Sequence, residues 1–351
     1  MRKTGLKVMA IAAAMAMGVA GCGSSATASS TSAASTAAST AASSTAAGDV
    51  SEIGDITLIM SSRDQFRSMV ESAASEAAAS MGINLVSQDA QDDTNKMLSF
   101  IETARNAGQK AVIVNMIDPN TTAQCIEAAG DMKIVFVNRM PENMDDLTEN
   151  SAVVSSEEKQ AGIYQGEYLS EYFKEQGKTD VNYLMISGTL GMNSTTDRSE
   201  YPITTMKENG LNPTAIQSDL ACEWDRAEAM NQVSTVLASG AEFDCIIANN
   251  DEMALGAIEA MKNANIDPSS VPVVGIDATA DGCAAIQEGT MAMTVFQDPI
   301  GQGRGALMAC VNLINGTPLN EGTEYELDET GRVMWVPFEP VTADNVADYA
   351  S

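Results

Sequence analysis

Short β-rich runs alternate with helical patterns along most of this chain, and this alternation is the strongest constraint on its fold. From Ile56 onward, apolar runs rich in Val and Ile are separated by longer stretches with helical periodicity. Repeated strand–helix–strand units build parallel sheets with helices packed on them. The first half predicts four strands, at Ile56–Met60, Asn84–Ser87, Ala111–Asn115 and Ile134–Asn138. The sequence therefore indicates an α/β protein.

Capping signals mark the helices between these strands. The stretch Phe66–Met81 places its apolar residues near one face, as an amphipathic helix requires. A second helix is predicted at Asn95–Ala107, where Gly108 provides a C-terminal cap. A third is expected to begin at Asp118-Pro119, with Asp as N-cap and Pro in the first turn.

The second half repeats the scheme after a long helix predicted at Lys159–Gln176. Its strands are expected near Tyr183–Ile186, Ala215–Gln217, Cys245–Ala248, Val271–Ile276 and Met291–Phe296. The stretch from Asp49 to Ser351 is too long for one average domain and fits two. We therefore expect two doubly wound domains of the same architecture.

The N-terminal region is typical of an exported lipoprotein. Arg2, Lys3 and Lys7 precede the apolar run Val8–Ala20, as in a secretory signal, and the following Gly21-Cys22 resembles a lipobox whose Cys is acylated. The alternative is a plain secretory signal with an incidental Cys. The run is too short for a transmembrane helix. The Ser/Thr/Ala-rich tract that follows contains no large apolar residue, so we expect a disordered tether.

Charge and composition exclude several functions. The net charge of the 351-residue chain is −29, and removing the three basic residues of the signal makes it −32. Such a surface repels nucleic acid and anionic lipid headgroups. The absence of His excludes His-based catalysis and His metal ligation. The remaining five cysteines are expected to be buried free thiols, with a single disulfide as the alternative: Cys125, Cys222, Cys245, Cys283 and Cys310.

Polar and aromatic residues recur where the predicted strands end. In open α/β sheets, ligands bind beyond the carboxyl ends of the strands. The residues at these positions are Asp64, Phe66, Asn138, Arg139, Ser194, Asp197, Arg198, Trp224, Asp225, Asn249, Asn250, Asp251, Asp277, Gln297 and Asp298. Planar amides, carboxylates and guanidinium groups match the hydroxyls of a sugar, and flat aromatic rings cover its C–H faces. This chemistry indicates recognition of a neutral polyol.

Each of these residues also has a structural interpretation. We expect Asp225, Asp251 and Asp298 to be helix N-caps rather than ligand contacts. Arg198 could form an ion pair within its domain instead of contacting a ligand. Trp335, in the run VMWVP, is expected to be a buried strand residue.

Several segments together resemble the type I periplasmic sugar-binding proteins of ABC transporters, and most closely the galactose/glucose-binding members. These are IIANNDEMALGAIEAMK at Ile246–Lys262, VFVNRMP at Val135–Pro141, VVGIDA at Val273–Ala278, LACEWD at Leu220–Asp225 and VPFEPVTADN at Val336–Asn345. The resemblance implies two doubly wound parallel-sheet lobes joined by a three-crossing hinge, with a cleft that closes on ligand. The expected parts are a signal at 1–21, a tether at 22–50, an N-terminal lobe at 51–155 plus 298–332, and a C-terminal lobe at 156–297 plus 333–351.

The resemblance also implies binding roles for individual residues. Asp64, Asn138, Arg198, Asn250 and Asp277 match the polar contacts of the family, and Phe66 and Trp224 match its two aromatic walls. Met192 stands where the galactose/glucose subgroup has His, Ser194 where it has Asp, and Gln297 where it has Asn. A site built to bond a given hydroxyl discriminates sharply when a partner changes, so these departures leave pentoses, inositols and furanosyl ligands open.

The implied function is capture of a galactose- or glucose-like monosaccharide in the cleft between the lobes and its delivery to an ABC permease. The protein is expected to be a monomer, lipid-anchored on the outside of a Gram-positive cell membrane. The alternatives are a sensor that docks on a membrane receptor, and a glycoside hydrolase using Asp64 and Asp277 as paired carboxylates. No cofactor is expected. The subgroup carries a calcium loop, but the matching stretch from Lys174 offers only Glu175 and Asp180, so no metal site is predicted.

Overall fold

The computed structural model describes residues 50–350. The predicted signal, Cys22 and almost all of the predicted tether lie outside the described residues, so these expectations stay predictions. Val50, which we placed at the end of the tether, instead begins a 3-10 turn, Val50–Glu52, and packs against the first hydrophobic core. Within residues 50–350, no helix combines the length and the apolar composition needed to cross a lipid bilayer.

The first of two sheets has seven strands. They are β1 (Ile56–Met60), β2 (Leu85–Asp89), β3 (Ala111–Val114), β4 (Lys133–Val137), β5 (Ser151–Ser155), β12 (Glu326–Leu327) and β13 (Val333–Trp335). Their spatial order is β12-β13-β5-β4-β3-β1-β2. All neighbours pair in parallel except β12 and β13, which are antiparallel. The first four predicted strands thus form one parallel sheet.

The second sheet also has seven strands. They are β6 (Asp180–Ser187), β7 (Asn212–Ala215), β8 (Leu220–Ala221), β9 (Cys245–Ala248), β10 (Val273–Val274), β11 (Met293–Gln297) and β14 (Phe338–Thr342). The order is β14-β11-β10-β9-β6-β7, with β8 pairing beside β7 on β6. Only β14 runs antiparallel to its neighbour. The fold prediction of two lobes with mainly parallel sheets is confirmed.

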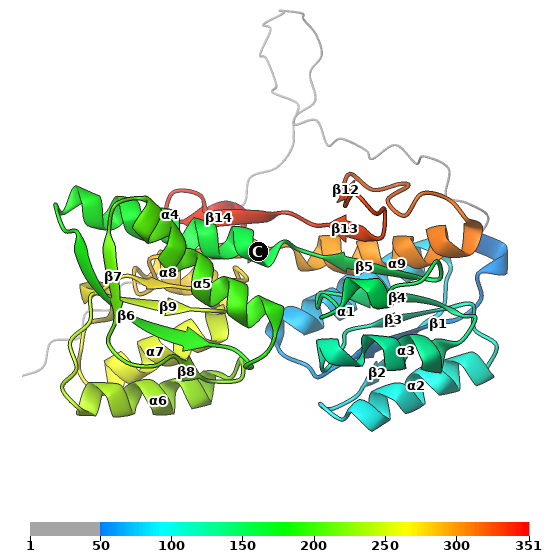
Figure 1. The fold of residues 1–351 in the computed structure, drawn as a ribbon, viewed down its shortest axis with the longest axis horizontal. Helices are drawn as coiled ribbons and strands as arrows, with labels where there is room; N and C mark the ends of the chain where they lie inside the picture. The colour runs from blue at the N-terminus through cyan, green and yellow to red at the C-terminus, as the bar shows by residue number, and fades with distance from the viewer. Residues whose placement is uncertain (1–49, 351) are drawn as a thin grey trace, which may run out of the picture. The chain divides into compact units, whose positions relative to one another are not determined.

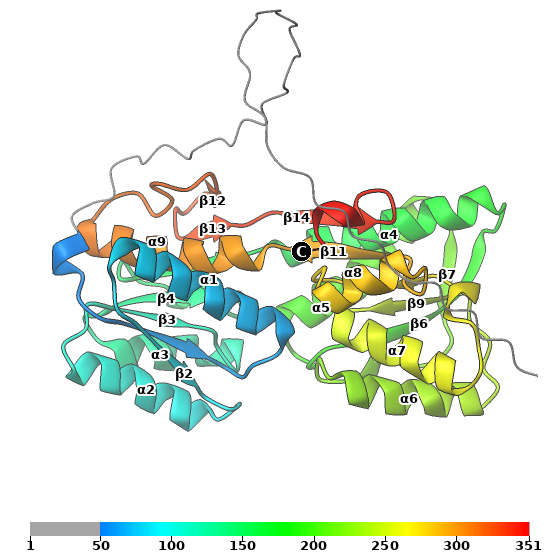
Figure 2. The same cartoon turned by 180° about the vertical axis from the view of Figure 1, so that it is seen from behind.

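Helices cover both faces of each sheet (Figures 1 and 2). On the first sheet, α1 (Gln65–Met81) and α9 (Pro299–Asn315) pack on one face, and α2 (Thr94–Asn106) and α3 (Thr122–Ala129) on the other. On the second, α4 (Glu158–Glu175) and α5 (Asn193–Glu208) oppose α6 (Arg226–Ala238), α7 (Asp251–Asn263) and α8 (Ala280–Gln287). The two faces of each sheet therefore have separate apolar cores.

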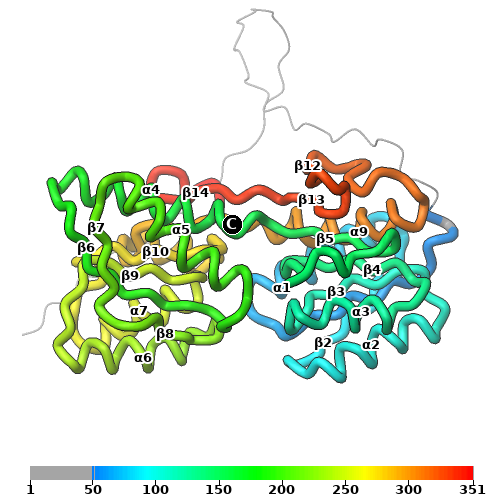
Figure 3. Tube along the Cα trace, in the orientation of Figure 1, coloured from blue at the N-terminus to red at the C-terminus, as the bar shows by residue number. Residues whose placement is uncertain are grey.

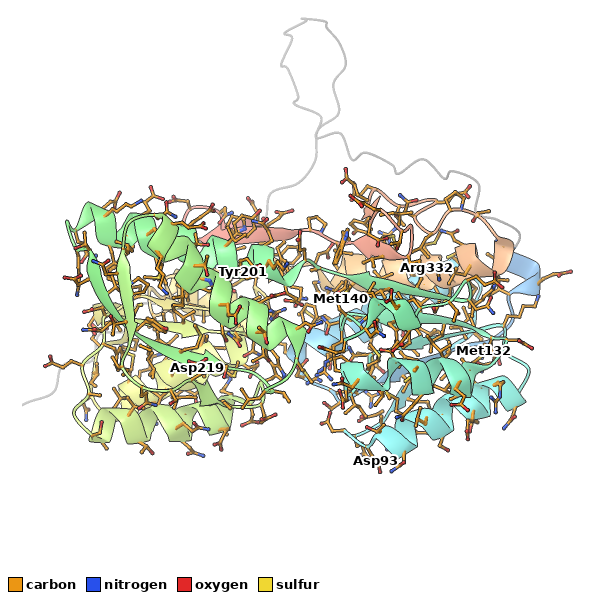
Figure 4. All side chains as sticks on the ribbon, viewed as in Figure 1. Asp93, Met132, Met140, Tyr201, Asp219 and Arg332 are labelled. Carbon is orange, nitrogen blue, oxygen red and sulfur yellow. The ribbon has the colours of Figure 1, made fainter. Side chains whose placement is uncertain are left out.

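Close packing of α4 on α5 depends on glycine. A Cβ at Gly162 or Gly166 would collide with Pro202 of α5. The Lys159 ammonium of α4 lies 5.6 Å from the centre of the Tyr201 ring, which Figure 4 labels on the second lobe. This helix pair fixes the position of α5, whose first turn carries residues of the site described below.

The chain crosses between the sheets three times, after β5, after β11 and after β13 (Figure 3). The third crossing differs from our boundary, which assigned 333–351 to the C-terminal lobe. Strand β13 pairs with β5, with Val333 opposite Val153, because Val333 and Met334 are buried in the first lobe. The crossing therefore falls after Trp335. Trp335 itself is a strand residue as predicted, but it is half-buried rather than buried.

Most predicted elements are present, with shifted ends. The strands at Ile56–Met60 and Cys245–Ala248 match β1 and β9. The strand expected near Ala215–Gln217 is shifted toward the N-terminus. Strand β7 spans Asn212–Ala215 and lies at the sheet edge, where Pro213 is tolerated. The third helix begins as a 3-10 turn capped by Asp118, and α3 follows it. All five cysteines in the described residues are buried free thiols, as predicted.

Candidate functional site

A polar pocket lies at the carboxyl ends of strands from both sheets. It is lined by Asp64, Phe66, Arg67, Asn138, Arg139, Glu158, Ser194, Arg198, Trp224, Asn250, Asp277 and Gln297. The space within it is about 450 Å³, including the part open to solvent.

The structure brings nine of the ten residues selected from the sequence to this one pocket. The tenth, Met192, lines two adjoining hollows, one of them shared with Asn138 and Ser194. Sequence reasoning missed Arg67 and Glu158, and it noted Arg139 without assigning it to the site. The signal for Glu158 was available, because an Arg buried in a pocket needs a carboxylate partner.

Two of the pocket residues are also helix N-caps. The Asp64 carboxylate accepts a hydrogen bond of 2.6 Å from the backbone N–H of Arg67 at the start of α1. The Asn250 Oδ1 accepts a bond of 3.0 Å from the N–H of Met253 at the start of α7. Capping uses only the Asn250 Oδ1, so the amide nitrogen keeps its two donors for other partners. Capping and lining the pocket are therefore compatible roles.

The N-cap predictions hold for two of three aspartates. Asp225 caps α6 and Asp298 caps α9 through their side chains. The prediction for Asp251 is wrong, because Asn250 takes the cap position and Asp251 becomes the first residue of α7. Its carboxylate is buried and bonds instead to Thr279 and Thr294.

Arg198 is the centre of the polar network in the second lobe. It lies on α5, is 4% exposed, and its Nε donates to Glu158 Oε2 at 2.6 Å. Its two terminal nitrogens donate to the Asn249 carbonyl at 2.9 Å and to Gln297 Oε1 at 3.2 Å. Arg198 therefore forms the ion pair within its lobe and also lines the pocket, and its contact with a ligand stays a prediction.

Asp277 is the buried carboxylate opposite Arg198, at 3.9 Å. Burial raises the pKa of Asp277 well above its usual range, and Arg198 only partly offsets this effect. Burial alone would lower the pKa of Arg198, but Glu158 and Asp277 outweigh it, so the pKa of Arg198 is raised. Arg198 therefore stays charged.

The first lobe contributes a second set of charges. Arg67 forms an ion pair of 2.8 Å with Asp64. Arg139 donates to the carbonyls of Met116 and Ile117, and its burial, together with nearby Arg67, lowers its pKa to about 10. The pocket thus holds three guanidinium groups and three carboxylates: Arg67, Arg139, Arg198, Asp64, Glu158 and Asp277. A site balanced in this way favours a ligand without net charge.

One aromatic wall, Trp224, and two polar residues of the pocket have unusual backbone geometry. Trp224 has φ +68°, and the pocket residues Asn138 and Asp277 have φ +70° and +124°. Non-glycine residues in this region are strained, and such strain concentrates at functional sites. A Cβ at Gly188 would overlap the indole of Trp224, so glycine is required there to admit the ring. The indole packs with the Arg198 guanidinium 5.8 Å from its ring centre.

Two hydrogen-bond donors of the pocket residues have no partner within the described part of the protein. They are the indole Nε1 of Trp224 and the amide Nε2 of Gln297, and both are buried. Buried donors without acceptors cost free energy, and native proteins rarely retain them without a function. Acceptor groups of a ligand would satisfy both.

Comparison with known proteins assigns the family. Residues 56–318 match the model of the periplasmic binding protein domain. The chain belongs to this family. This periplasmic binding protein is 33% identical over 289 residues, 82% of the chain and 89% of the relative, to a Rhizobium meliloti protein named for rhizopine binding. It is 29% identical, over 82% of the chain and 88% of the relative, to the D-galactose/methyl-galactoside binding periplasmic protein of Haemophilus influenzae.

Solved structures show the same two-lobed fold. An ABC transporter solute binding protein from Bacillus halodurans C-125, with bound myo-inositol, superposes on this periplasmic binding protein with a TM-score of 0.74 and 30% identity. The likeness covers 87% of the present chain and 99% of the Bacillus chain. The fold prediction from sequence is therefore confirmed by independent structures.

Proposed function

We propose that the protein captures a neutral monosaccharide or a cyclitol of similar size between its lobes and delivers it, chemically unchanged, to an ABC permease. The observation that carries this proposal is the pair of unpartnered buried donors, Trp224 Nε1 and Gln297 Nε2, in a pocket with balanced charges. Hydroxyl groups are the acceptors that fit, because an anionic ligand would meet the three carboxylates of the lining.

The remaining lining supports the same ligand class. The Asn250 amide can donate to one hydroxyl, and Asp277 and Glu158 can accept from others. Phe66 and Trp224 supply flat apolar surfaces for the C–H faces of a ring. The similarity to proteins named for galactose and rhizopine, and to one crystallised with myo-inositol, agrees with a polyhydroxylated ring.

The ligand proposal includes galactose-like and glucose-like hexoses without selecting one. Ser194 and Gln297 line the pocket where the galactose/glucose subgroup has Asp and Asn, and Met192 lies beside it where that subgroup has His. These side chains remove an acid and an imidazole from the inventory of hydrogen-bond partners. We therefore expect the hydroxyl pattern that is recognised to differ from that of galactose.

The proposed location is outside the cell membrane of a Gram-positive cell, with a monomer held by acylated Cys22. The support is the basic, apolar and lipobox-like order of residues 1–22 and the Ser/Thr/Ala tract that follows. One acyl-bearing anchor with a long tether would keep the binding protein near its permease. Partition of wild-type and Cys22→Ala protein between detergent and aqueous phases tests this proposal, because only the wild type should follow the detergent.

The ligand class is tested by thermal shift of the purified protein against monosaccharides and cyclitols. A ligand at a hundredfold excess over its Kd stabilises the protein by about 2.7 kcal/mol, which raises the melting temperature by several degrees. Trp224→Ala and Asn250→Ala should abolish the shift. A panel without any shift would refute the ligand class, and a shift that survives both substitutions would refute the site.

A further inference from the structure

Asp251 is a buried carboxylate directly beneath the pocket that the ligand-binding proposal does not use. It is fully buried, and within residues 50–350 no basic side chain pairs with it at 4.0 Å or less. Its Oδ2 accepts bonds from the N–H and hydroxyl of Thr279 at 2.8 and 3.1 Å. Its Oδ1 accepts from the hydroxyl of Thr294 at 2.6 Å. An unpaired buried carboxylate is costly, so its retention needs a reason.

The surrounding backbone leaves room for this carboxylate. A Cβ at Gly275 would collide with Asp251 Oδ1, and a Cβ at Gly282 would collide with Asp251 Oδ2. Neither glycine has a positive φ, so backbone conformation does not require glycine at either position. Space for the Asp251 side chain is the feature that both glycines share.

The hydrogen bonds of Asp251 connect three segments, and each segment presents one residue to the pocket. Asp251 follows Asn250, Thr279 lies two residues after Asp277, and Thr294 lies three residues before Gln297 on β11. All three neighbours line the pocket. Asp251 therefore joins the segments of these three pocket residues through its side chain.

The segment after β10 is the one that most needs such support. Asp277 and Ala278 have φ +124° and +49°, conformations that non-glycine residues rarely adopt. The Ala278 N–H donates to the Thr294 hydroxyl at 3.2 Å, and that hydroxyl in turn donates to Asp251. Strained backbone of this kind persists only where the surrounding structure fixes it.

We propose that Asp251 is a positioning residue that fixes the geometry of Asn250, Asp277 and Gln297 for ligand binding through its bonds to Thr279 and Thr294. This inference rests on the proposed function, because the geometry matters for binding only if the pocket binds a ligand. The effect of Asp251 on the three segments can nevertheless be measured without ligand. Asp251 also acts on Asp277 through its charge. The charged groups that face Asp277 are Arg198 from α5, Asp251 from α7, Glu158 from α4 and Asp64 from the start of α1.

Hydrogen–deuterium exchange of the ligand-free protein tests the positioning directly. Asp251→Ala should speed exchange of segments 250–254, 276–280 and 293–297 by about tenfold or more, because they lose their shared acceptor. Asp251→Asn should stay near wild type, since its amide oxygen still accepts from Thr279 and its amide nitrogen can donate to the Thr294 hydroxyl. Segments on α2 and α3 of the first lobe serve as the internal control.

Calorimetric titration with myo-inositol and with D-galactose supplies the binding readout. Whichever probe binds the wild type should bind Asp251→Ala about tenfold or more weakly, and Asp251→Asn should restore affinity to within about threefold. Removing the neighbouring negative charge lowers the pKa of Asp277, so in Asp251→Asn the loss of affinity on acidification should move to lower pH. A residue that only stabilises the fold would leave the affinity of the folded Asp251→Ala protein unchanged.

Unchanged exchange of the three segments in Asp251→Ala would overturn the proposal. If Asp251→Ala does not fold, Thr294→Val takes its place. Thr294→Val removes one hydrogen bond to Asp251 and the acceptor of the Ala278 N–H. Wild-type exchange of segment 276–280 in Thr294→Val would likewise overturn the proposal. If neither probe binds the wild type, the ligand proposal fails on those ligands, while the exchange experiment still decides the role of Asp251.

Discussion

At the scale of single residues, the pocket combines charges that a globular protein would ordinarily keep in water. Asp277 is 5% exposed and pairs with Arg198 only at 3.9 Å, which is longer than a hydrogen bond. Glu158, at 2.6 Å, is the closer partner of Arg198. Asp277 therefore lies beside Arg198 without a hydrogen bond to it, which leaves its oxygens available to ligand hydroxyls at a cost in stability.

Asp277→Asn tests this cost. The pKa of Asp277 in the folded protein lies above its unfolded value near 3.9, so the native state binds the extra proton and wild-type stability falls as pH rises between these two values. Asp277→Asn cannot ionise at this position, so its unfolding free energy does not fall for this reason as the pH rises. We expect ligand-free Asp277→Asn to be more stable than wild type at pH 7.5, by on the order of 1 kcal/mol, and the difference to shrink toward pH 4.

Urea denaturation at pH 4, 5.5 and 7.5 measures this difference, and titration with the ligand found by thermal shift should show affinity at least about tenfold weaker. Asp281, an exposed carboxylate on α8, gives the matched control Asp281→Asn. A variant that is less stable than wild type at pH 7.5 would show that Asp277 stabilises the fold, contrary to this argument.

At the scale of elements, the site is assembled by helix N-termini placed after parallel strands. Helices α1 and α7 begin directly beyond β1 and β9, and their caps are Asp64 and Asn250. The cap must carry a side chain that accepts a hydrogen bond, and the strand end must carry a polar group for the ligand. Asp64 and Asn250 each meet both requirements. An N-cap role therefore does not exclude a ligand contact at these two positions.

The two roles of Asn250 can be separated by substitution. Asn250→Ser retains an oxygen for the Met253 N–H but lacks the amide nitrogen, so stability should stay close to wild type while ligand affinity falls about tenfold or more. Asn250→Ala loses both groups and should in addition cost about 1 kcal/mol in unfolding free energy. Denaturant unfolding and calorimetric titration of both variants check the separation. Wild-type affinity in Asn250→Ser would show that the cap is the only role of the side chain.

At the scale of the whole molecule, the fold was predictable because the strongest signals are local. Runs such as Ile56–Met60 and Cys245–Ala248 are fully buried apolar strands and were located to the residue. The strand at Asn212–Ala215 was misplaced, because an edge strand with exposed residues carries little apolar pattern. The register of Val333 depended on pairing with Val153, a contact across 180 positions that local pattern does not encode.

Most of the candidate site was predictable because its residues follow strand ends, and the prediction was incomplete because other residues reach the site in a different way. Strand ends located Asp64, Asn138, Ser194, Asn250, Asp277 and Gln297, and the family resemblance added Met192, which lies beside the pocket. Glu158 was missed because it follows a crossing between the lobes rather than a strand end of its own lobe, and only Arg198 reveals its role. Asp251 was mistaken for a cap because sequence cannot show which of two adjacent polar residues turns into the core.

Both lobes contribute residues to the pocket, so ligand binding should favour their closure. A ligand that bonds Asp64 and Asn138 of the first lobe and Asn250 and Asp277 of the second binds best when both sets reach it, so it should stabilise the arrangement with the lobes closest. Within residues 50–350, the covalent links between the lobes are the three crossings, which can act as hinges. Small-angle scattering of the purified protein should therefore show a smaller radius of gyration when saturating ligand is added.

Trp224→Ala, which removes one wall of the pocket without altering the crossings, is the matched control and should show no compaction at the same concentration. An unchanged radius in wild-type protein that calorimetry shows to be saturated would mean that the pocket binds without closure, and delivery to a permease would then need a signal other than lobe movement.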